Sequence, residues 1–311
     1  MHDENKKRLG QFFTIKNPFL LKPFVDWISK NDIKNEVVLE PFAGSNNLIE
    51  FLRKIGFAKE YFSYDLDPKS FNVIKRDTLI DFPRGFSVCI TNPPWLAKNS
   101  ATRRGLFYPQ THFDDIYKLA LNKCLENCEY VGALVPESYI QTNLFFDRLD
   151  TFVSISGKIF SETENPVGLA LFNKKATNDV KIFKDNFFIG YLTELLLKKP
   201  KLIKDNQIVF NHPQGNLGLI AIDSTKKASI RFCDVEELKN YAVKPQGRSI
   251  TKIFTPYKIN IELFNDRLCK MRKETNDIFL SPFKGLRSDG QYRRRLDFGT
   301  ARSIISKDFL N

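Results

Sequence analysis

Along the first 174 residues, short apolar runs and longer segments of helical periodicity follow one another. The apolar runs predict seven strands, at residues 37–40, 61–65, 71–77, 86–92, 130–136, 152–160 and 167–173. Apolar residues three or four positions apart predict helices at 48–57 and 113–127. Strands that alternate with helices are typical of the α/β class, here a doubly wound, mostly parallel sheet.

After about residue 178 the pattern becomes irregular, basic and aromatic. We therefore predict two domains, residues 1–178 and 179–311. The charge is divided in the same way. Residues 175–311 hold 26 Lys and Arg against 15 Asp and Glu, whereas residues 1–174 hold 22 against 21. Such an excess indicates a polyanionic partner for the C-terminal part, and the alternative is a basic surface without a partner.

Composition restricts the class of protein further. The chain is 42% hydrophobic and 13% aromatic, which excludes a disordered chain. The N-terminus lacks an apolar run and no stretch is as long as a membrane span, so we expect a cytoplasmic protein without a membrane partner. Cys124 and Cys128 lie four residues apart with no histidine cluster nearby, which favours buried reduced thiols and no metal site.

Polar side chains end four of the predicted strands: Glu40, Asp65, Asp77 and Asn92. In an open parallel sheet, ligands bind beyond the carboxyl ends of the strands, so these side chains are expected at one crevice. A single acid after a strand is more often a helix cap or a turn residue. Three acids at successive strand ends, with a glycine-containing turn after the first, favour a binding site instead.

That turn reads "EPFAGSNN" (40–47), and its small residues let a ligand approach the backbone. It lacks GxxxxGK and a full GxGxxG, which disfavours a nucleoside triphosphate and a dinucleotide. Asp65 lies 25 residues beyond Glu40, a spacing that suits an acid accepting from both ribose hydroxyls. Asp77 is placed to accept from an adenine amino group. S-adenosylmethionine, with a ribose, an adenine and an amino-acid end, satisfies all three features.

The tetrapeptide "NPPW" (92–95) follows the fourth strand. The amino group of a nucleobase is a poor nucleophile because its lone pair is delocalised into the ring. The Asn92 side-chain oxygen and the Pro93 carbonyl can accept its two hydrogens. Pro93 and Pro94 fix φ and hold these acceptors in place before substrate arrives. Trp95 supplies a flat face for a flipped base.

Five segments in this order resemble the amino-group DNA methyltransferases, specifically the gamma class of N6-adenine enzymes from restriction–modification systems. They are "GQFFT" (10–14), "LEPFAGSNN" (39–47), "YDLDP" (64–68), "RDTL" (76–79) and "TNPPW" (91–95). The resemblance covers about residues 8–173. It implies a seven-stranded methyltransferase sheet followed by a basic target-recognition domain. It also implies methyl transfer from S-adenosylmethionine to the N6 of adenine in double-stranded DNA by base flipping, which protects DNA from a cognate restriction endonuclease.

The resemblance also assigns residues to roles. The implied cofactor contacts are Thr14, Glu40, Pro41, Ala43, Gly44, Asp65, Leu66, Asp77 and Asn92. Residues Asn92, Pro93, Pro94 and Trp95 would hold the target adenine, and Phe160 would pack on the flipped base from the other side. The alternative for Phe160 is a core phenylalanine at a strand end. Asn46 stands where the family usually has glycine, and because asparagine tolerates left-handed backbone we expect altered detail rather than lost binding.

The expected DNA contacts are arginines. They are Arg103 and Arg104 in the polar segment 98–105, expected to be a loop, and Arg287, Arg293, Arg294, Arg295 and Arg302 in the C-terminal part. The three consecutive arginines cannot all face one way, so at least one is expected on solvent. Some of this set would contact phosphates and one or two would reach base edges.

Three other functions remain open. A methyltransferase acting on RNA bases fits the motifs, since charge does not separate RNA from DNA. A glutamine-amide protein methyltransferase uses the same turn, but the C-terminal basic mass counts against it. A DNA-binding protein with a decayed catalytic domain is disfavoured by the intact turn and by the three cofactor acids.

Overall fold

The computed structural model describes residues 14–161 and 163–306. The chain divides into two compact units, Met1–Phe188 and Ile189–Asn311. The division falls later than the predicted residue 178, because the strand Lys181–Lys184 still pairs in parallel with the sheet of the first unit.

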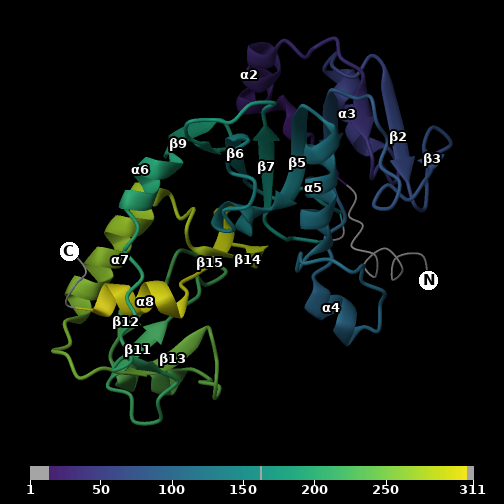
Figure 1. The fold of residues 1–311 in the computed structure, drawn as a ribbon. Coiled ribbons are helices and arrows are strands. Elements are labelled where there is room, and N and C mark those ends of the chain that lie inside the picture. Colours follow the sequence, from purple (N-terminus) through teal and green to yellow (C-terminus); the bar gives the residue numbers. More distant parts are fainter. Residues whose placement is uncertain (1–13, 162, 307–311) are drawn as a thin grey trace. The chain divides into compact units, whose positions relative to one another are not determined.

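A nine-stranded sheet of order β3-β2-β1-β4-β5-β7-β6-β8-β9 organises the first unit (Figure 1). Its strands are β1 (Val38–Glu40), β2 (Tyr61–Asp65), β3 (Ile74–Lys75), β4 (Val88–Thr91), β5 (Tyr130–Pro136), β6 (Leu149–Ile155), β7 (Val167–Phe172), β8 (Lys181–Lys184) and β9 (Phe187–Tyr191). The pairs β1–β2, β1–β4, β2–β3, β4–β5 and β6–β8 are parallel, whereas β7 is antiparallel to β5 and β6. The sheet is mostly parallel, as predicted, but it has nine strands where seven are predicted, because β8 and β9 continue it beyond β6.

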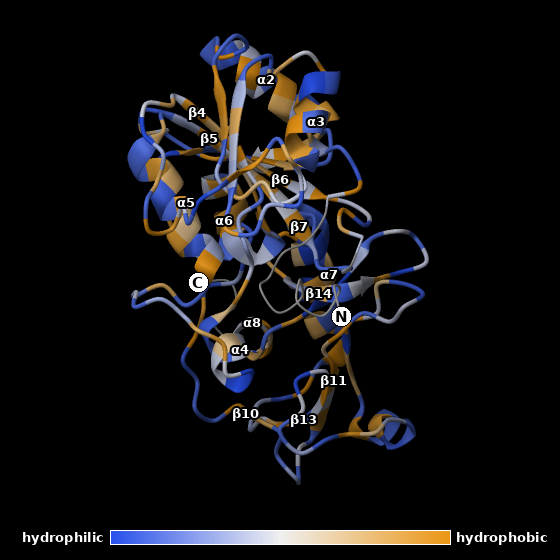
Figure 2. Ribbon diagram, turned by 90° about the vertical axis from the view of Figure 1, so that its right-hand side faces the viewer, coloured by the Kyte–Doolittle hydropathy of each residue, from blue (hydrophilic) through white to orange (hydrophobic). Residues whose placement is uncertain are grey.

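Helices cover both faces of this sheet. The helices of this unit are η1 (Pro18–Leu20), α2 (Lys22–Asn31), α3 (Asn47–Lys54), α4 (Lys98–Arg103), α5 (Ile116–Asn127) and η2 (Glu137–Gln141). Of these, α4 packs away from the sheet, with Ala101 against Leu96 and Ile116. Ile90 of β4 belongs to the same buried cluster as Trp27 of α2, together with residues of α3. Its neighbour Cys89 points to the opposite face and meets Cys124 of α5. Figure 2 shows hydrophobic and hydrophilic positions on each of α2, α3 and α5, as expected of helices that bury one side.

Cys124 and Cys128 are buried, as predicted. All five thiols are free, and Cys89, Cys124, Cys128 and Cys233 are buried while Cys269 is exposed. Within the described residues, no three His, Cys, Asp or Glu side chains gather as metal ligands. No helix in the described part of the chain combines the length and the apolar character that crossing a membrane requires.

The second unit has a four-stranded antiparallel sheet of order β10-β13-β11-β12 and a separate pair β14–β15. Its elements are α6 (Leu192–Leu197), β10 (Val209–Phe210), β11 (Leu217–Ile220), β12 (Arg231–Cys233), η3 (Val235–Asn240), β13 (Ile250–Phe254), α7 (Ile261–Thr275), β14 (Ser281–Leu286), β15 (Tyr292–Arg295) and α8 (Phe298–Ile305). Phe264, Leu268 and Met271 of α7 share one core with the sheet residue Leu219. This unit therefore has its own apolar core.

Candidate functional site

A cavity of about 480 Å³ lies in the first unit, at the carboxyl ends of β1, β2 and β4. Its volume falls within the range of small-molecule sites, about 300–1,000 Å³. The predicted site residues that line it are Thr14, Glu40, Ala43, Gly44, Asp65, Leu66, Asp77, Asn92 and Pro94. The topology therefore brings together all four polar strand ends that the sequence pattern indicates. Pro41, Pro93, Trp95 and Phe160 are not among the lining residues.

Glu40 ends β1 and is almost completely buried. One of its carboxyl oxygens, Oε1, accepts hydrogen bonds from Thr91 Oγ1 (2.7 Å) and from the backbone N–H of Phe42 (3.0 Å). Burial raises the pKa of Glu40 to about 8, although these hydrogen bonds oppose the rise. At neutral pH this carboxyl is therefore largely protonated, and a cationic group beside it would favour the carboxylate.

Asp65 ends β2 and holds the turn that follows β1. Its Oδ2 accepts from the backbone N–H of Gly44 and its Oδ1 from that of Asp67, both at 2.8 Å. Gly44 has φ of 53°, a left-handed conformation that a residue without Cβ adopts at little cost. Burial raises the pKa of Asp65, while the two backbone donors act in the opposite direction. The turn is thus shaped by protein contacts alone.

Asn46 has the left-handed backbone expected for it, with φ of 67°. Its side chain is buried, and Oδ1 accepts a 2.7 Å hydrogen bond from Ser63 Oγ. Its Nδ2 has no hydrogen-bond partner among the described residues. Asn46 therefore fits the turn and ties it to β2 through Ser63.

Asp77 lies half-buried at the cavity wall and accepts from the backbone N–H of Leu79 (3.1 Å). Next to it, Thr78 Oγ1 donates to the carbonyl of Pro41 (2.8 Å), which fixes this segment to the turn after β1. Pro41 thus contributes through its backbone and does not line the cavity.

Three exposed apolar side chains stand among the lining residues: Leu66 (55% exposed), Ile80 (83%) and Phe107 (87%). Ile80 and Phe107 are absent from the sequence-based assignment. Large apolar side chains left in solvent beside a cavity mark a surface that a ligand can cover. In the sequence Ile80 follows Leu79 and Phe107 follows Leu106, so each continues a short apolar run and nothing distinguishes it as a residue of a site.

The turn Asn92–Trp95 begins one residue after β4 ends. Asn92 and Pro94 line the cavity, while Pro93 is buried. Leu96, the residue after the turn, is held at both of its backbone polar groups. Its N–H donates to Asp115 Oδ1 (3.0 Å), and its carbonyl accepts from the N–H of Ile116 (3.1 Å). Burial raises the pKa of Asp115 to about 6. The sequence does not indicate the contact between Asp115 and Leu96, because "FDDIY" (113–117) indicates only the start of a helix.

Trp95 and Phe160 are in contact with each other, with ring centroids 5.2 Å apart at an interplanar angle of 81°. The Trp95 Nε1–H donates to the carbonyl of Leu134 at 3.4 Å, and Phe160 is fully buried in the core. Two rings in edge-to-face contact leave no room for a base between them. The structure thus gives Phe160 the core environment of the alternative interpretation, and its role on a flipped base stays a prediction.

Thr14 forms an isolated antiparallel bridge with Phe160, and the adjacent N–H of Ile15 donates to Ile159 (2.8 Å). The Thr14 hydroxyl is buried at the cavity wall and has no hydrogen-bond partner among the described residues. Such a group is a candidate for a ligand contact. The rest of the "GQFFT" segment, residues 10–13, lies outside the described residues.

The segment of Arg103 and Arg104 is helical. The prediction of a loop at 98–105 is wrong, because residues 98–103 form α4 around the buried Ala101. Both arginines are exposed. Arg103 donates to the Asn99 carbonyl and to Ser100 Oγ, both in its own helix. Their predicted role as DNA contacts stays a prediction.

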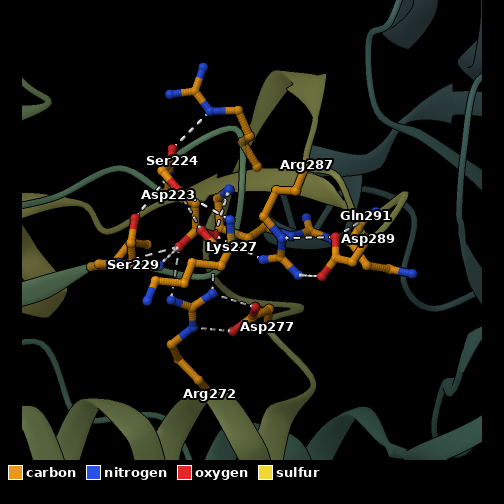
Figure 3. A network of polar contacts seen from close by, with 12 residues as sticks. Asp223, Ser224, Lys227, Ser229, Arg272, Asp277, Arg287, Asp289 and Gln291 are labelled. Atoms are coloured by element: carbon orange, nitrogen blue, oxygen red, sulfur yellow. Dashed lines mark hydrogen bonds and ion pairs between the residues drawn. The ribbon is translucent and has the colours of Figure 1, made fainter.

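Two of the C-terminal arginines have buried side chains in the second unit, and Figure 3 shows one of them, Arg287. Arg287 pairs with Asp289 (2.8 Å) and Asp223 (3.2 Å), and its side chain is 9% exposed. Arg294 is 5% exposed, since alternate residues of β15 are buried. We therefore withdraw both residues as DNA contacts. A buried arginine that is fully engaged within the protein is not available to a phosphate.

The remaining predicted C-terminal arginines, Arg293, Arg295 and Arg302, are half-buried. At least one of the three consecutive arginines 293–295 was expected to be exposed to solvent, but none of them is fully exposed. Arg293 donates to the carbonyl of Asp223 (2.8 Å) and stands 5.2 Å from the Phe283 ring. Arg295 lies on the same side of β15 as Arg293. Arg302 stands 5.2 Å from the ring of Phe210. Their predicted DNA contacts stay predictions.

The cavity's residues fit S-adenosylmethionine by their chemistry. The carboxylates of Asp65 and Asp77 suit hydroxyl and amino donors, and the Thr14 hydroxyl offers a donor and acceptor that no described residue uses. Gly44 in the turn has a left-handed backbone and no side chain, which lets a ligand approach the backbone closely. The apolar rim of Leu66 and Ile80 suits a flat ring.

Neither the family profiles nor the curated protein sequences compared with this chain give a match. Among solved structures, the methyltransferase subunit of a type I restriction–modification system from Streptococcus thermophilus is 18% identical, with a TM-score of 0.41 over 56% of this chain and 47% of that one. The type I restriction enzyme EcoKI M protein is 12% identical, with a TM-score of 0.40 over 85% and 71%. The type IIG restriction endonuclease BpuSI is 16% identical, with a TM-score of 0.40 over 77% and 33%. The chain thus spans about half the length of the Streptococcus thermophilus subunit.

Proposed function

We propose that this protein transfers a methyl group from S-adenosylmethionine to the N6 amino group of adenine in double-stranded DNA at a specific sequence. The observation that carries the proposal is one cavity shared by two sets of groups. The cavity is lined by the acids Asp65 and Asp77. It is also lined by Asn92 and Pro94 of the "NPPW" turn, which follows β4. A cofactor site and an amino-group site are thereby adjacent.

The chain's own groups have separate tasks in this proposal. S-adenosylmethionine, when bound, supplies an electrophilic methyl group. Asp65 accepts from the ribose hydroxyls and Asp77 from the adenine amino group. Thr14 and the turn of Glu40, Pro41, Ala43 and Gly44 hold the amino-acid end.

The amino-group end of the cavity belongs to the turn after β4. The Asn92 side chain and the Pro93 carbonyl accept the hydrogens of the target amine, and the ring of Trp95 supports the extruded base. Positioning of this kind contributes up to roughly 7–11 kcal/mol in favourable cases, so no strong general base is required.

The basic charge of residues 175–311 supports a polyanionic substrate, of which double-stranded DNA is the one that the motif order favours. Most of the net charge of +12 lies in residues 175–311, and association with a polyanion is the simplest consequence. A methyltransferase of this kind would protect DNA from a cognate restriction endonuclease in the same cell.

Transfer of tritium from labelled S-adenosylmethionine tests the proposal directly. Duplex DNA, ribosomal RNA and total protein are offered separately to the full chain, and labelled DNA is digested to nucleosides. Label in N6-methyladenine supports the proposal. Label only in RNA or only in glutamine would assign the protein to one of the two other methyltransferase classes, and no label in any acceptor would favour a binding protein.

A further inference from the structure

Asp223 is the centre of a polar network in the second unit (Figure 3). It is completely buried. Its carboxylate accepts from Arg272 through two bonds of 3.1 Å and from Arg287 at 3.2 Å. It also accepts from the backbone N–H groups of Ser229 (2.7 Å) and Arg294 (3.2 Å). Burial alone would raise the pKa of Asp223, but Arg272 and the other donors hold it below its ordinary value.

The network joins two loops that are distant in the sequence. We call residues 224–229 and 287–291 the loop pair. Ser288 links them directly, because its N–H donates to the Thr225 carbonyl (2.8 Å) and its Oγ to the Lys226 carbonyl (2.6 Å). Arg287 links them again through Asp223, and it also pairs with Asp289 at the second loop's tip.

Each loop is also closed on itself. In the first, Ser224 Oγ accepts from the N–H groups of Lys226 (3.2 Å) and Lys227 (3.1 Å), and Ser229 Oγ accepts from the N–H of Ser224 (2.7 Å). In the second, the N–H of Arg287 donates to the Gln291 carbonyl (2.8 Å). The conformation of both loops is thus fixed by hydrogen bonds within the unit.

What the loop pair presents to solvent is small and basic. Its exposed residues are Thr225, Lys226, Lys227, Ala228, Ser288, Asp289 and Gly290. Within the described part of the chain no salt bridge neutralises Lys226 or Lys227. Two uncompensated lysines flanked by hydroxyl-bearing and glycine residues suit a phosphate backbone, which takes bonds from Lys, Ser, Thr and backbone N–H groups.

We propose that the loop pair is a preformed contact surface for the DNA phosphate backbone, in which Lys226 and Lys227 bind phosphates and the Asp223 network holds both loops in place. This inference rests on the proposed function. The sequence pattern predicts Arg287 as a phosphate contact, but Arg287 pairs with Asp223 and Asp289 inside the unit. The proposal assigns the phosphate contacts to Lys226 and Lys227 instead, which the sequence pattern does not distinguish. A surface fixed before binding loses little conformational entropy when the duplex arrives.

The test compares two double variants of the full chain. Lys226→Ala/Lys227→Ala removes the charges of the loop pair, and Lys258→Ala/Lys270→Ala removes two exposed lysines elsewhere in the same unit. Duplex dissociation constants are measured against salt concentration. We expect the loop-pair variant to lower the slope of log K against log salt by about two units, because each lost phosphate contact releases one counterion fewer. The control pair should change the slope by less than about half a unit.

Two further measurements complete the test. Affinity for S-adenosylmethionine and the Tm should match the wild type in the loop-pair variant, since neither lysine is buried. In wild-type protein, hydrogen exchange at the amides of 224–229 and 287–291 should slow when duplex binds. An unchanged salt slope or unchanged exchange in protein that binds and methylates duplex overturns the loop-pair assignment alone. Wild-type protein that neither binds nor methylates duplex overturns the proposed function as well.

Discussion

Thr91 and Glu40 are joined across neighbouring strands by a 2.7 Å hydrogen bond from the threonine hydroxyl to Oε1 of the carboxyl. Each is the last residue of its strand, β4 and β1 respectively. The bond therefore ties the residue before Asn92 to the first residue of the turn 40–47. It also leaves a buried acid at the cavity wall whose pKa is raised to about 8 by burial.

That acid makes stability depend on pH. Between its ordinary pKa of 4.5 and about 8, folded Glu40 keeps a proton that the unfolded chain has released. The contribution of this group to the free energy of unfolding therefore falls as pH rises through that window. Glu40→Gln should have nearly the wild-type Tm at pH 4.5 and a higher Tm at pH 8.5, by about 2–4 °C for each kcal/mol relieved. Calorimetry of the two proteins measures this, with the exposed Glu60→Gln as control; a Tm difference that is constant with pH would contradict the role of Glu40.

Removal of the carboxylate of Asp65 should weaken cofactor binding. A hydrogen bond to a charged group contributes about 1.5–3 kcal/mol, so Asp65→Ala should raise the cofactor dissociation constant by roughly ten- to a hundredfold. Asp67→Ala is the matched control, because Asp67 is an exposed acid two residues away that does not line the cavity, and the variant keeps the backbone N–H that donates to Asp65. Titration calorimetry gives both constants. Equal affinities for the two variants would remove Asp65 from the cofactor site.

Asn92 should affect chemistry rather than cofactor affinity. Asn92→Ala deletes an acceptor for the target amine and should abolish methyl transfer while the cofactor dissociation constant stays within about threefold of wild type, since this acceptor acts on the other substrate. Asn92→Asp keeps an oxygen acceptor at the same place and should retain measurable turnover. Single-turnover transfer of labelled methyl measures both. Full activity in Asn92→Ala is incompatible with the proposed mechanism.

Trp95 should support an extruded base on the ring face that Phe160 leaves free. With 2-aminopurine at the target position, binding should raise fluorescence as the base leaves its stack in the duplex. Trp95→Ala should reduce the stabilisation of the extruded base by about 1–3 kcal/mol, the contribution of one stacked base, and slow methyl transfer accordingly. Trp95→Phe should keep most of this stabilisation. If neither the fluorescence nor the rate distinguishes these variants, Trp95 is not the platform.

The first unit could be largely predicted from the sequence because its signals are local. A strand that ends in an acid or an amide is visible in a few residues, and parallel topology alone brings Glu40, Asp65, Asp77 and Asn92 to one cavity. The left-handed backbone of Asn46 follows from the same kind of local rule. The strands β8 and β9 were not predicted. They form a half-buried edge of the sheet, and the charged residues within 181–191 interrupt the apolar pattern by which a strand is identified.

The second unit could not be predicted in the same way. Phe264, Leu268 and Met271 do follow a helical period, and Asn260 caps α7 by accepting from Leu263. That signal was available and was overlooked among irregular neighbours. The burial of the Arg287 guanidinium has no local signal at all, because it depends on Asp223, more than 60 residues earlier in the chain.

The exposed rim of Leu66, Ile80 and Phe107 has a calorimetric consequence. Apolar surface that leaves water on binding carries a negative heat-capacity change. A flat ring laid over these side chains should therefore make the enthalpy of cofactor binding more exothermic at 35 °C than at 15 °C. Ile80→Ser would remove part of that apolar surface and flatten the temperature dependence, even where the affinity at one temperature hardly changes.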